Sequence, residues 1–303
     1  MNVWLIKRKI RREQTRLFNV AYDVKWFFSN RKTSEVCLNR IPRPCEIIVS
    51  LTTFPERIIS CVKTIRSILN QKDIKPDRVE LWLAYDQFPN GEKNLPTEML
   101  ELKSLGLEIC WCEDLRSYKK LIPALIKHPD SIIVTADDDV YYNEHWLERL
   151  YNSYLNMPQY VHCHRATKMV FENNGFKTIP GGLSYYSEPS YLNKLVGIGG
   201  VLYPPKILYK DVTDVERFMK LAPTNDDIWF WLMAVKANTK ISVVQGNIPQ
   251  PVDVLLADKS PKLTNINDRG QKLFWIQFDQ ILSAYPEIKE KLISSWRDFK
   301  GIE

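Results

Sequence analysis

The chain has 303 residues, of which 45% are hydrophobic and 12% aromatic, enough apolar material for one large α/β domain or two smaller ones. Its 11 glycines argue against a loop-rich all-β protein, and the sequence contains no apolar run of 18 residues, as a membrane-crossing helix would need. The six cysteines form no C-x-x-C pair and have no accompanying histidine cluster, which favours buried, reduced thiols in a cytoplasmic protein.

Positive charge is concentrated at the N-terminus. Residues 1–32 hold nine basic residues against two acidic ones, a net charge of +7, so the rest of the chain sums to −1 although the whole carries +6. Apolar residues recur there at steps of three, four and seven, which predicts an amphipathic helix: Val3, Ile6, Ile10, Leu17, Ala21, Val24 and Phe28. The segment is not a signal peptide, because charge interrupts its apolar stretch after Ile6.

This basic segment has two interpretations. It could lie on an anionic membrane surface as a peripheral contact, or it could dock on the protein's own domain with a solvated basic face. Nucleic-acid binding is not expected, because the remaining chain carries no basic patch and no recognised nucleic-acid-binding motif.

Strands and helices are expected to alternate after the basic segment. We predict strands over 46–53, 79–84, 107–112 and 131–136, helices over 58–69 and 119–127, and two C-terminal helices over 267–285 and 286–296. The pattern predicts an α/β, Rossmann-like fold: a mostly parallel sheet flanked by helices. Such sheets bind ligands beyond the carboxyl ends of their strands. Polar residues follow each predicted strand there: Thr52, Thr53 and Arg57, then Asp86, then Asp114, Lys119 and Lys120, then Asp137, Asp138 and Asp139.

The three consecutive aspartates follow an apolar strand directly. Side chains alternate along an extended segment, so we expect Asp137 and Asp139 to point the same way and Asp138 to point away. Two hard carboxylate oxygens suit Mg²⁺ or Mn²⁺ with open positions for substrate phosphates. An EF-hand loop is excluded, because Tyr141 stands where that loop needs Asp or Asn. The alternative is a solvated acidic turn.

A second acidic pair, Asp226 and Asp227, opens a predicted helix in the stretch T-N-D-D-I-W-F-W. Acids in the first turn favour the helix dipole, and Thr224 or Asn225 is a suitable N-cap, so capping is one interpretation. A carboxylate beside an apolar wall could instead have a raised pKa and act as a general base. Between the two acidic sites, the G-I-G-G stretch is expected to let backbone approach a ligand closely.

An ordered set of motifs resembles bacterial glycosyltransferases of the GT-A fold, in the family-two-like inverting branch. The set is S-L-T-T-F-P-E-R, a strand ending before Asp86, K-K-L-I-P-A-L, T-A-D-D-D-V-Y-Y, G-I-G-G and N-D-D-I-W-F-W, over roughly residues 44–246. The D-x-D motif alone is weak, whereas the ordered set is more specific. We therefore expect a basic N-terminal segment (1–43), a catalytic domain (44–246) with a nucleotide-sugar half (44–142) and an acceptor half (143–246), and a C-terminal loop with helices (247–303).

The resemblance implies transfer of a sugar from a nucleoside-diphosphate sugar, with a UDP-sugar favoured, to a hydroxyl of a glycan or glycolipid. It implies inversion, Mn²⁺ or Mg²⁺ as cofactor, a part in surface polysaccharide synthesis, and a location in the cytoplasm or peripherally at the inner face of the cell membrane. The implied nucleotide-sugar-binding residues are Thr52, Pro55, Arg57, Asp86, Lys119, Lys120, Asp137 and Asp138. Asp139 with Asp137 would bind the metal, Asp227 would be the catalytic base with Asp226 beside it, and Gly199, Gly200 and Trp229 would line the acceptor side.

The sequence departs from the family in one respect. Many relatives supply a later histidine as a metal ligand, but all four histidines here precede Asp227. Gln245, Asp253, Asp258 or water could take that place.

Two other functions stay open. A haloacid-dehalogenase-like phosphatase also uses a strand followed by Asp-x-Asp, a lysine and a later acidic pair, but its first motif opens the domain and it wants Thr or Val at the position of Tyr141. A non-catalytic sugar-nucleotide-binding protein would keep Asp139 and the metal but lack turnover.

Overall fold

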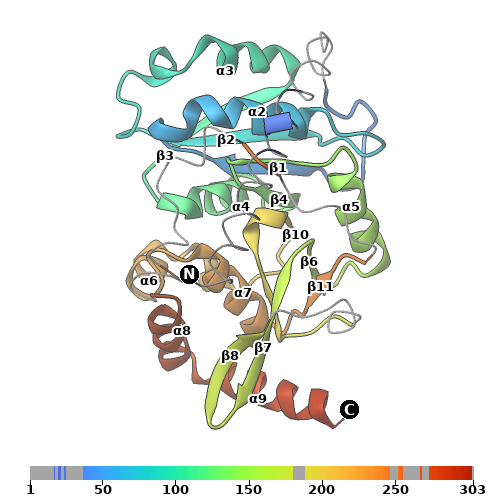
Figure 1. Ribbon diagram of the computed structural model, residues 1–303, viewed down its shortest axis with the longest axis vertical. Helices are drawn as coiled ribbons and strands as arrows, with labels where there is room; N and C mark the ends of the chain where they lie inside the picture. Colours follow the sequence, from blue (N-terminus) through green and yellow to red (C-terminus); the bar gives the residue numbers. More distant parts are fainter. Residues whose placement is uncertain are drawn as a thin grey trace, which may run out of the picture.

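The computed structural model describes residues 17, 20, 21, 24, 37–179, 188–245, 252–254, 267 and 273–301. A seven-stranded sheet in the order β11-β6-β10-β4-β1-β2-β3 forms its centre (Figure 1). The strands are β1 (Ile47–Thr52), β2 (Arg78–Ala84), β3 (Leu107–Cys112), β4 (Ile132–Ala136), β6 (Val161–Cys163), β10 (Val201–Tyr203) and β11 (Ile241–Val243). Only β10 runs antiparallel to its neighbours, β4 and β6. The prediction of a mostly parallel, Rossmann-like α/β sheet is confirmed.

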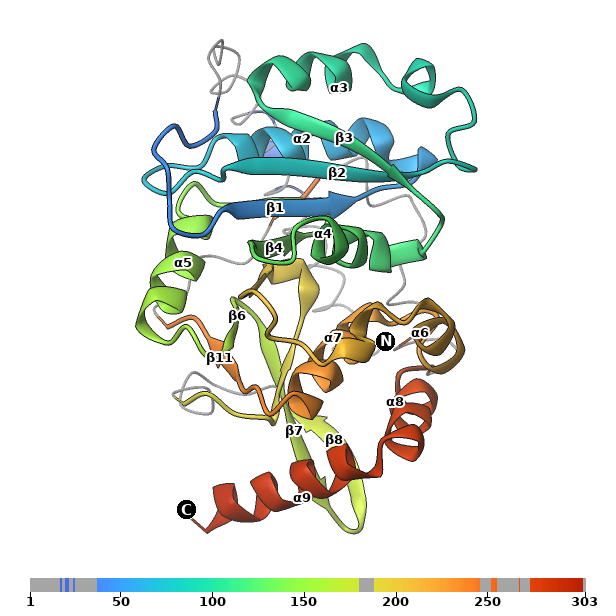
Figure 2. The same ribbon diagram turned by 180° about the vertical axis from the view of Figure 1, so that it is seen from behind.

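Each face of the sheet has its own hydrophobic core, because alternate strand residues point to opposite faces. One core packs Ile47, Val49 and Leu51 against α2 (Ile58–Leu69), α3 (Thr97–Glu101) and α5 (Trp146–Asn156). The other packs Ile48 and Ile133 against α4 (Ile122–Lys127), α6 (Val215–Leu221) and α7 (Asp226–Lys236). Figure 2 shows α2 and α3 on one side of β1 and β2, with α4 on the other. Helices thus cover both faces, as the alternating pattern predicted.

Short 3₁₀ turns connect these elements at the sheet edges. They are η1 (Pro55–Arg57), η2 (Gly91–Asn94), η3 (Leu102–Leu105), η4 (Arg116–Lys120), η6 (Gly197–Gly199) and η7 (Lys210–Thr213). Three of them, η1, η4 and η6, carry residues that the sequence marks as candidate site residues. These turns therefore carry polar residues of the candidate site, whereas the long strands contribute residues to the hydrophobic core.

A second, three-stranded antiparallel sheet lies at the end of the molecule away from α3 (Figure 1). It consists of β7 (Ala166–Glu172), β8 (Gly175–Ile179) and β9 (Asn193–Leu195), with α8 (Leu273–Ala284) and α9 (Pro286–Lys300) beside it. The Phe278 ring joins these parts, stacked 6.0 Å from Trp231 and edge-on 5.3 Å from Phe176. The two predicted C-terminal helices are confirmed within the part of the chain that the structure describes.

Most of the predicted basic helix over 1–32 lies outside the described residues. Leu17, Val20, Ala21 and Val24 are described, and they are helical with exposed side chains. From Cys37 onward the chain packs on the sheet, where the Cys37 N–H donates to the Leu105 carbonyl at 2.9 Å and the Asn39 N–H donates to the Pro76 carbonyl at 2.8 Å. Among the described residues, no helix combines the length and the apolar character that crossing a membrane requires.

Candidate active site

Polar side chains meet where β1 and β4 end. These parallel strands pair Leu51 with Ala136, so Thr52 and Asp137 leave the sheet side by side. The start of α2, the turns η4 and η6 and the first turn of α7 bring the other polar residues to the same edge. This is the edge at which ligands bind in open α/β sheets.

Arg57 holds two of the three aspartates. Its Nη1 lies 2.8 Å from Asp138 Oδ1 and 3.1 Å from Asp139 Oδ2, and Thr53 Oγ1 donates to Asp138 Oδ2 at 2.5 Å. Burial alone would lower the pKa of Arg57, but the two carboxylates raise it, so the guanidinium stays charged. Arg57 therefore pairs with Asp138 and Asp139 together, and its single positive charge balances one of their two negative charges.

The expected alternation of the aspartates does not hold. Asp138 and Asp139 share Arg57, whereas Asp137 turns to Lys120. The physical reason is that β4 ends at Ala136 and the chain bends at 138–139 instead of continuing as an extended strand. The period of two that governs side chains in a strand no longer applies beyond that point.

Lys120 joins the aspartate motif to the acidic pair of α7. Its Nζ lies 2.8 Å from Asp137 Oδ1, 3.0 Å from Asp226 Oδ2 and 3.9 Å from Asp227 Oδ1. Burial alone would lower the pKa of Lys120, but the three carboxylates raise it well above its usual range. Ser117 Oγ also donates to Asp226 Oδ1 at 2.9 Å. One buried ammonium thus brings together acids that lie far apart in the sequence.

Asp227 lies beside the Lys120 ammonium, and its surroundings shift its pKa. The cap of α7 is Asn225, whose Oδ1 accepts from the Ile228 N–H at 3.2 Å, so neither aspartate is needed for capping. The Gly197 N–H donates to Asp227 Oδ2 at 2.8 Å. Burial raises the pKa of Asp227 to about 6, with Asp226 also raising it and Lys120 opposing the rise. A carboxyl group with this pKa is mostly ionised at neutral pH and accepts a proton more readily than an ordinary aspartate.

The two acids of α7 differ in access. The Asp226 side chain is 8% exposed, whereas that of Asp227 is 24% exposed. Asp226 is occupied by Ser117 and Lys120, and Asp227 presents the freer carboxylate. Of the pair, Asp227 therefore has the more solvent-accessible carboxylate.

Tyr142, which the sequence analysis did not single out, links the two halves of the site. Its hydroxyl accepts from the Asp137 N–H at 2.8 Å and donates to the Ile198 carbonyl at 3.4 Å. Ile198 follows Gly197, the residue that contacts Asp227. The side chain is buried, so this hydroxyl connects the aspartate motif to the turn that positions Asp227.

Glycines keep the G-I-G-G turn close to its neighbours. Gly200 has φ +87°, in the left-handed region that favours glycine, and the indole of Trp146 occupies the space that a Cβ would need. The Trp146 Nε1–H donates to the Gly199 carbonyl at 2.7 Å. A Cβ at Gly197 would lie 2.6 Å from Asp227 Oδ1 and 3.0 Å from Lys120 Nζ. The backbone therefore approaches the acids more closely than any other residue type allows.

Buried polar side chains on α2 and just after it support the segment that follows the aspartates. Thr64 Oγ1 donates to the Asp138 carbonyl at 3.0 Å, and Ser67 Oγ accepts from the Tyr142 N–H at 3.0 Å. Gln71 Nε2 donates to the Asn143 carbonyl at 2.8 Å, and its Oε1 accepts from the Leu147 N–H at 2.9 Å. Thr64 and Ser67 share one face of α2, and Gln71 follows two residues after the helix ends. Together they fix the backbone from residue 138 to 147.

Other predicted site residues lie at the edge of the sheet but contact different partners. Asp86 and Pro55 are exposed, and Thr52 Oγ1 donates to the Trp82 carbonyl at 2.8 Å. Lys119 is buried with its Nζ 2.5 Å from Asp114 Oδ1, so the structure does not bring it to the aspartate motif. Of the two lysines predicted to reach a nucleotide, only Lys120 contacts that motif.

The assignment of Trp229 to the acceptor side is wrong for this structure. The residue is 0% exposed, and its Nε1–H donates to the Val212 carbonyl at 3.1 Å inside the core. Helical periodicity does not identify an exposed position here, because α7 is buried on all sides from Ile228 to Val235 and has no solvent-exposed face there.

The donor chemistry at the aspartate motif fits a hard divalent cation. Asp137 and Asp139 supply carboxylate oxygens, which lie beside the cationic side chains of Lys120 and Arg57 respectively. A segment from later in the chain lies against the motif. Strand β12 (Val252–Asp253) pairs with β5 (Val140–Tyr141), and the Val254 N–H donates to the Asp139 carbonyl at 2.9 Å. Asp253 is thereby placed opposite Val140, next to the motif. Gln245 Nε2 donates to the Val243 carbonyl, and Asp258 lies outside the described residues.

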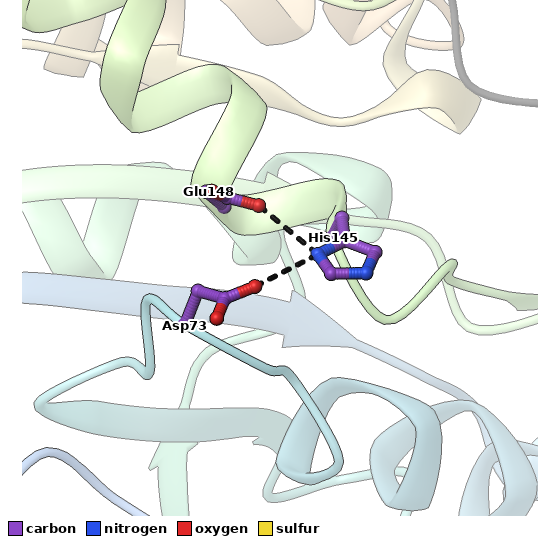
Figure 3. A group of neighbouring side chains, drawn as sticks. All are labelled: Asp73, His145 and Glu148. Carbon is purple, nitrogen blue, oxygen red and sulfur yellow. Dashed lines mark hydrogen bonds and ion pairs between the residues drawn. The ribbon is translucent and has the colours of Figure 1, made fainter.

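Two compact groups of metal-ligating side chains occur elsewhere in the described part of the chain. One is Asp73, His145 and Glu148, in which His145 Nδ1 lies 3.0 Å from both carboxylates (Figure 3). It lies between the end of α2 and the start of α5. The other is Glu80, Glu108 and Cys110 on β2 and β3. Neither includes an aspartate of the motif.

No protein-family model and no curated protein matches the chain. Among solved structures, one that aligns with it is the mannosyltransferase PcManGT from Pyrobaculum calidifontis in complex with GDP-Man and Mn²⁺. The alignment has a TM-score of 0.45 and 13% sequence identity, and it covers 90% of this chain and 70% of that one. At this level of similarity, neither the fold nor the activity of this chain is inferred from it.

Proposed function

We propose that the protein is a glycosyltransferase that moves a sugar from a nucleoside-diphosphate sugar to a hydroxyl of a glycan or glycolipid acceptor. The observation that carries the proposal is the Lys120 ammonium, which lies 2.8 Å from Asp137 and 3.9 Å from Asp227. It brings a candidate cation-binding motif and a candidate base to one sheet edge. Transfer from such a donor needs both, because the acceptor hydroxyl loses a proton while the diphosphate leaving group gains negative charge.

The donor side is assigned to the ends of β1 and β4. Asp137 and Asp139 would hold Mn²⁺ or Mg²⁺, and the ion supplies positive charge to the diphosphate leaving group when bound. Arg57 lies beside Asp139 and would stabilise the same developing charge. Thr52, Pro55 and Asp86 lie at this edge and are assigned to the nucleotide.

The acceptor side is assigned to α7 and the G-I-G-G turn. The Asp227 carboxylate takes the proton of the acceptor hydroxyl as that oxygen attacks the anomeric carbon, and the bond from that carbon to the diphosphate oxygen breaks. Attack in line from the opposite side inverts the anomeric centre. Lys120 lies 3.9 Å from Asp227 and keeps the carboxylate ionised before the transfer.

A location at the inner face of the cell membrane is part of the proposal. Residues 1–32 carry a net charge of +7, and each basic residue near an anionic surface contributes up to about 1 kcal/mol at low salt. Sedimentation with anionic vesicles tests it, since a chain lacking 1–32 should lose binding while keeping turnover on a soluble acceptor. Unfolding of the truncated chain would show instead that the segment docks on the domain.

The test of the activity is a panel of nucleoside-diphosphate sugars with Mn²⁺, measured by release of the nucleoside diphosphate in the presence of a sugar acceptor. Release that depends on the acceptor and on Asp227 supports the proposal. Calorimetric binding of a donor without any turnover identifies a non-catalytic binder. Release of phosphate from a phosphomonoester, with no use of any sugar donor, identifies a phosphatase.

A further inference from the structure

A second constellation of polar side chains lies on the sheet face covered by α4. Glu80 of β2 and Glu108 and Cys110 of β3 place ligand atoms within 4.8 Å of one another. His128, directly after α4, has its Nε2 2.8 Å from Glu80 Oε1. Adjacent strands in parallel register explain the grouping, because Glu80 pairs with Glu108. This face is separate from the edge where the proposed transfer occurs.

Glu80 is an unusual residue for the middle of a sheet. It is 0% exposed, and its Oε2 has no hydrogen-bond partner among the described residues. The neighbouring Ser50 Oγ and Trp82 Nε1 also lack partners there. A buried carboxylate oxygen without a partner is costly, so such atoms usually contact an ion or an ordered water.

We propose that Glu80, Glu108, Cys110 and His128 form a binding site for a divalent transition metal ion of the Zn²⁺ class. The donor set of one thiolate, one imidazole and two carboxylates suits a borderline-soft ion and is a poor match for Mg²⁺ or Ca²⁺. Three of the ligand atoms already lie within 4.8 Å of one another, and His128 contacts one of them, Glu80. Typical Zn–ligand distances of about 2.0–2.3 Å require the four side chains to move closer together when the ion binds.

Lys127 serves as the cation of this cluster when no metal is bound. Its Nζ lies 2.7 Å from Glu80 Oε1, 3.6 Å from Cys110 Sγ and 3.9 Å from Glu108 Oε2. It therefore contacts three of the proposed ligands. Because its side chain is 41% exposed, the ammonium can move out to solvent when an ion enters.

Charge is balanced in both states. Without metal, Lys127 pairs with Glu80, and Arg78 Nη1 lies 2.8 Å from Glu108 Oε1 while its Nε lies 3.6 Å from the exposed Glu46. On metal binding, the Cys110 thiol releases its proton to solvent and Lys127 leaves. The ion and Arg78 then balance two carboxylates and one thiolate. The His145 group of Figure 3 lacks this character, because the Asp73 side chain is 58% exposed.

The site would join the edge strand β3 to β2 and to the end of α4. Helix α4 follows η4 directly, and η4 carries Lys120. A metal here therefore has a structural effect on the element that positions Lys120, without contacting substrate. The inference does not depend on the proposed glycosyl transfer.

Co²⁺ titration of the full chain tests the site, because a cobalt–thiolate bond gives a charge-transfer absorption band. The band should appear with the natural chain and with Cys112→Ser, a control two residues along the same strand. It should disappear with Cys110→Ser and Cys110→Ala, with folding checked by circular dichroism. Lys127→Met should tighten Co²⁺ binding about tenfold, because no ammonium has to be displaced. Absence of the band in the natural chain, or its persistence in both folded Cys110 variants, overturns the proposal.

Discussion

The main-chain N–H of Gly197 donates to Asp227 Oδ2 at 2.8 Å, and Asp227 lies so close that no space is left for a side chain at position 197. A carboxylate that accepts one backbone hydrogen bond is fixed in direction and keeps its other oxygen for a substrate. The contact also ties the position of the proposed base to the G-I-G-G turn.

Gly197→Ala should lower the rate of transfer while leaving donor binding unchanged. The added Cβ would lie 2.6 Å from Asp227 Oδ1, so the carboxylate must move away from its position. A misplaced base costs about 10- to 100-fold in rate, less than its removal. Gly175→Ala is the matched control, because the only neighbour a Cβ meets there is 3.9 Å away. Equal rates for both variants at saturating donor would show that the contact is unimportant.

Asp139→Asn should abolish the metal-dependent part of donor binding while the fold survives. Asp138 remains to pair with Arg57, so the variant does not leave a buried guanidinium without a partner. Calorimetry with a nucleoside diphosphate, with and without Mn²⁺, measures the effect. Asp130→Asn, a surface aspartate paired with Lys206, serves as the control. A Mn²⁺-dependent affinity that is the same in Asp139→Asn and the natural chain would remove this residue from the cation site.

Gln71→Ala should destabilise the fold strongly for a polar residue. The side chain donates to the Asn143 carbonyl, which also accepts from the Trp146 N–H, and accepts from the Leu147 N–H, which would lose its buried partner. An unmet buried group costs about 1–3 kcal/mol, so the free energy of unfolding should fall by roughly 1–3 kcal/mol. Urea denaturation measures it. Lys72→Ala, which loses only an exposed ion pair with Glu144, should change it by less than about 1 kcal/mol. A similar small loss for Gln71→Ala would contradict the supporting role of Gln71.

The rate should fall as the pH drops through about 6. The pKa of Asp227 is raised to about 6, and the group acts as a base only when it is ionised, so activity is present above that pH and lost below it. In Asp226→Asn the acidic limb should shift to lower pH, because the negative charge of Asp226 helps to raise the pKa of Asp227. The pH dependence of kcat/KM, which reports the ionisation of the free enzyme, tests both statements. A limb that stays in place in Asp226→Asn would assign it to another group.

The fold was readable from the sequence because its information is local. Apolar runs of strand length and the helical stripe over 58–69 lie within single elements, and the structure has β3 at Leu107–Cys112 and α2 at Ile58–Leu69 as expected. The pair formed by Thr64 and Ser67 was also visible in principle, since polar residues at helical spacing on a buried face indicate buried hydrogen bonds. The three-stranded antiparallel sheet around β7 was not anticipated from the same patterns.

The site was less predictable because its contacts are not local. That Asp137 turns to Lys120 while Asp138 and Asp139 share Arg57 depends on where β4 stops, and element ends are set by tertiary packing. Trp229 was misassigned because α7 is buried all round, which periodicity cannot reveal when most positions are apolar. The role of Tyr142 depends on a turn some 55 residues later in the chain, so no pattern near it points to that role.

Single-turnover and steady-state transfer by Asp227→Asn tests the central claim most directly. The amide keeps the shape of the side chain but accepts no proton, so kcat should fall by about 10²- to 10⁴-fold. Donor affinity by calorimetry should stay near that of the natural chain, because Asp137, Asp139 and Arg57 are untouched. Asp226→Asn, whose side chain contacts Lys120 and Ser117 and is less exposed, should cost less. Full activity of Asp227→Asn with a saturating donor would contradict the account, since the proton of the acceptor would then go to another group.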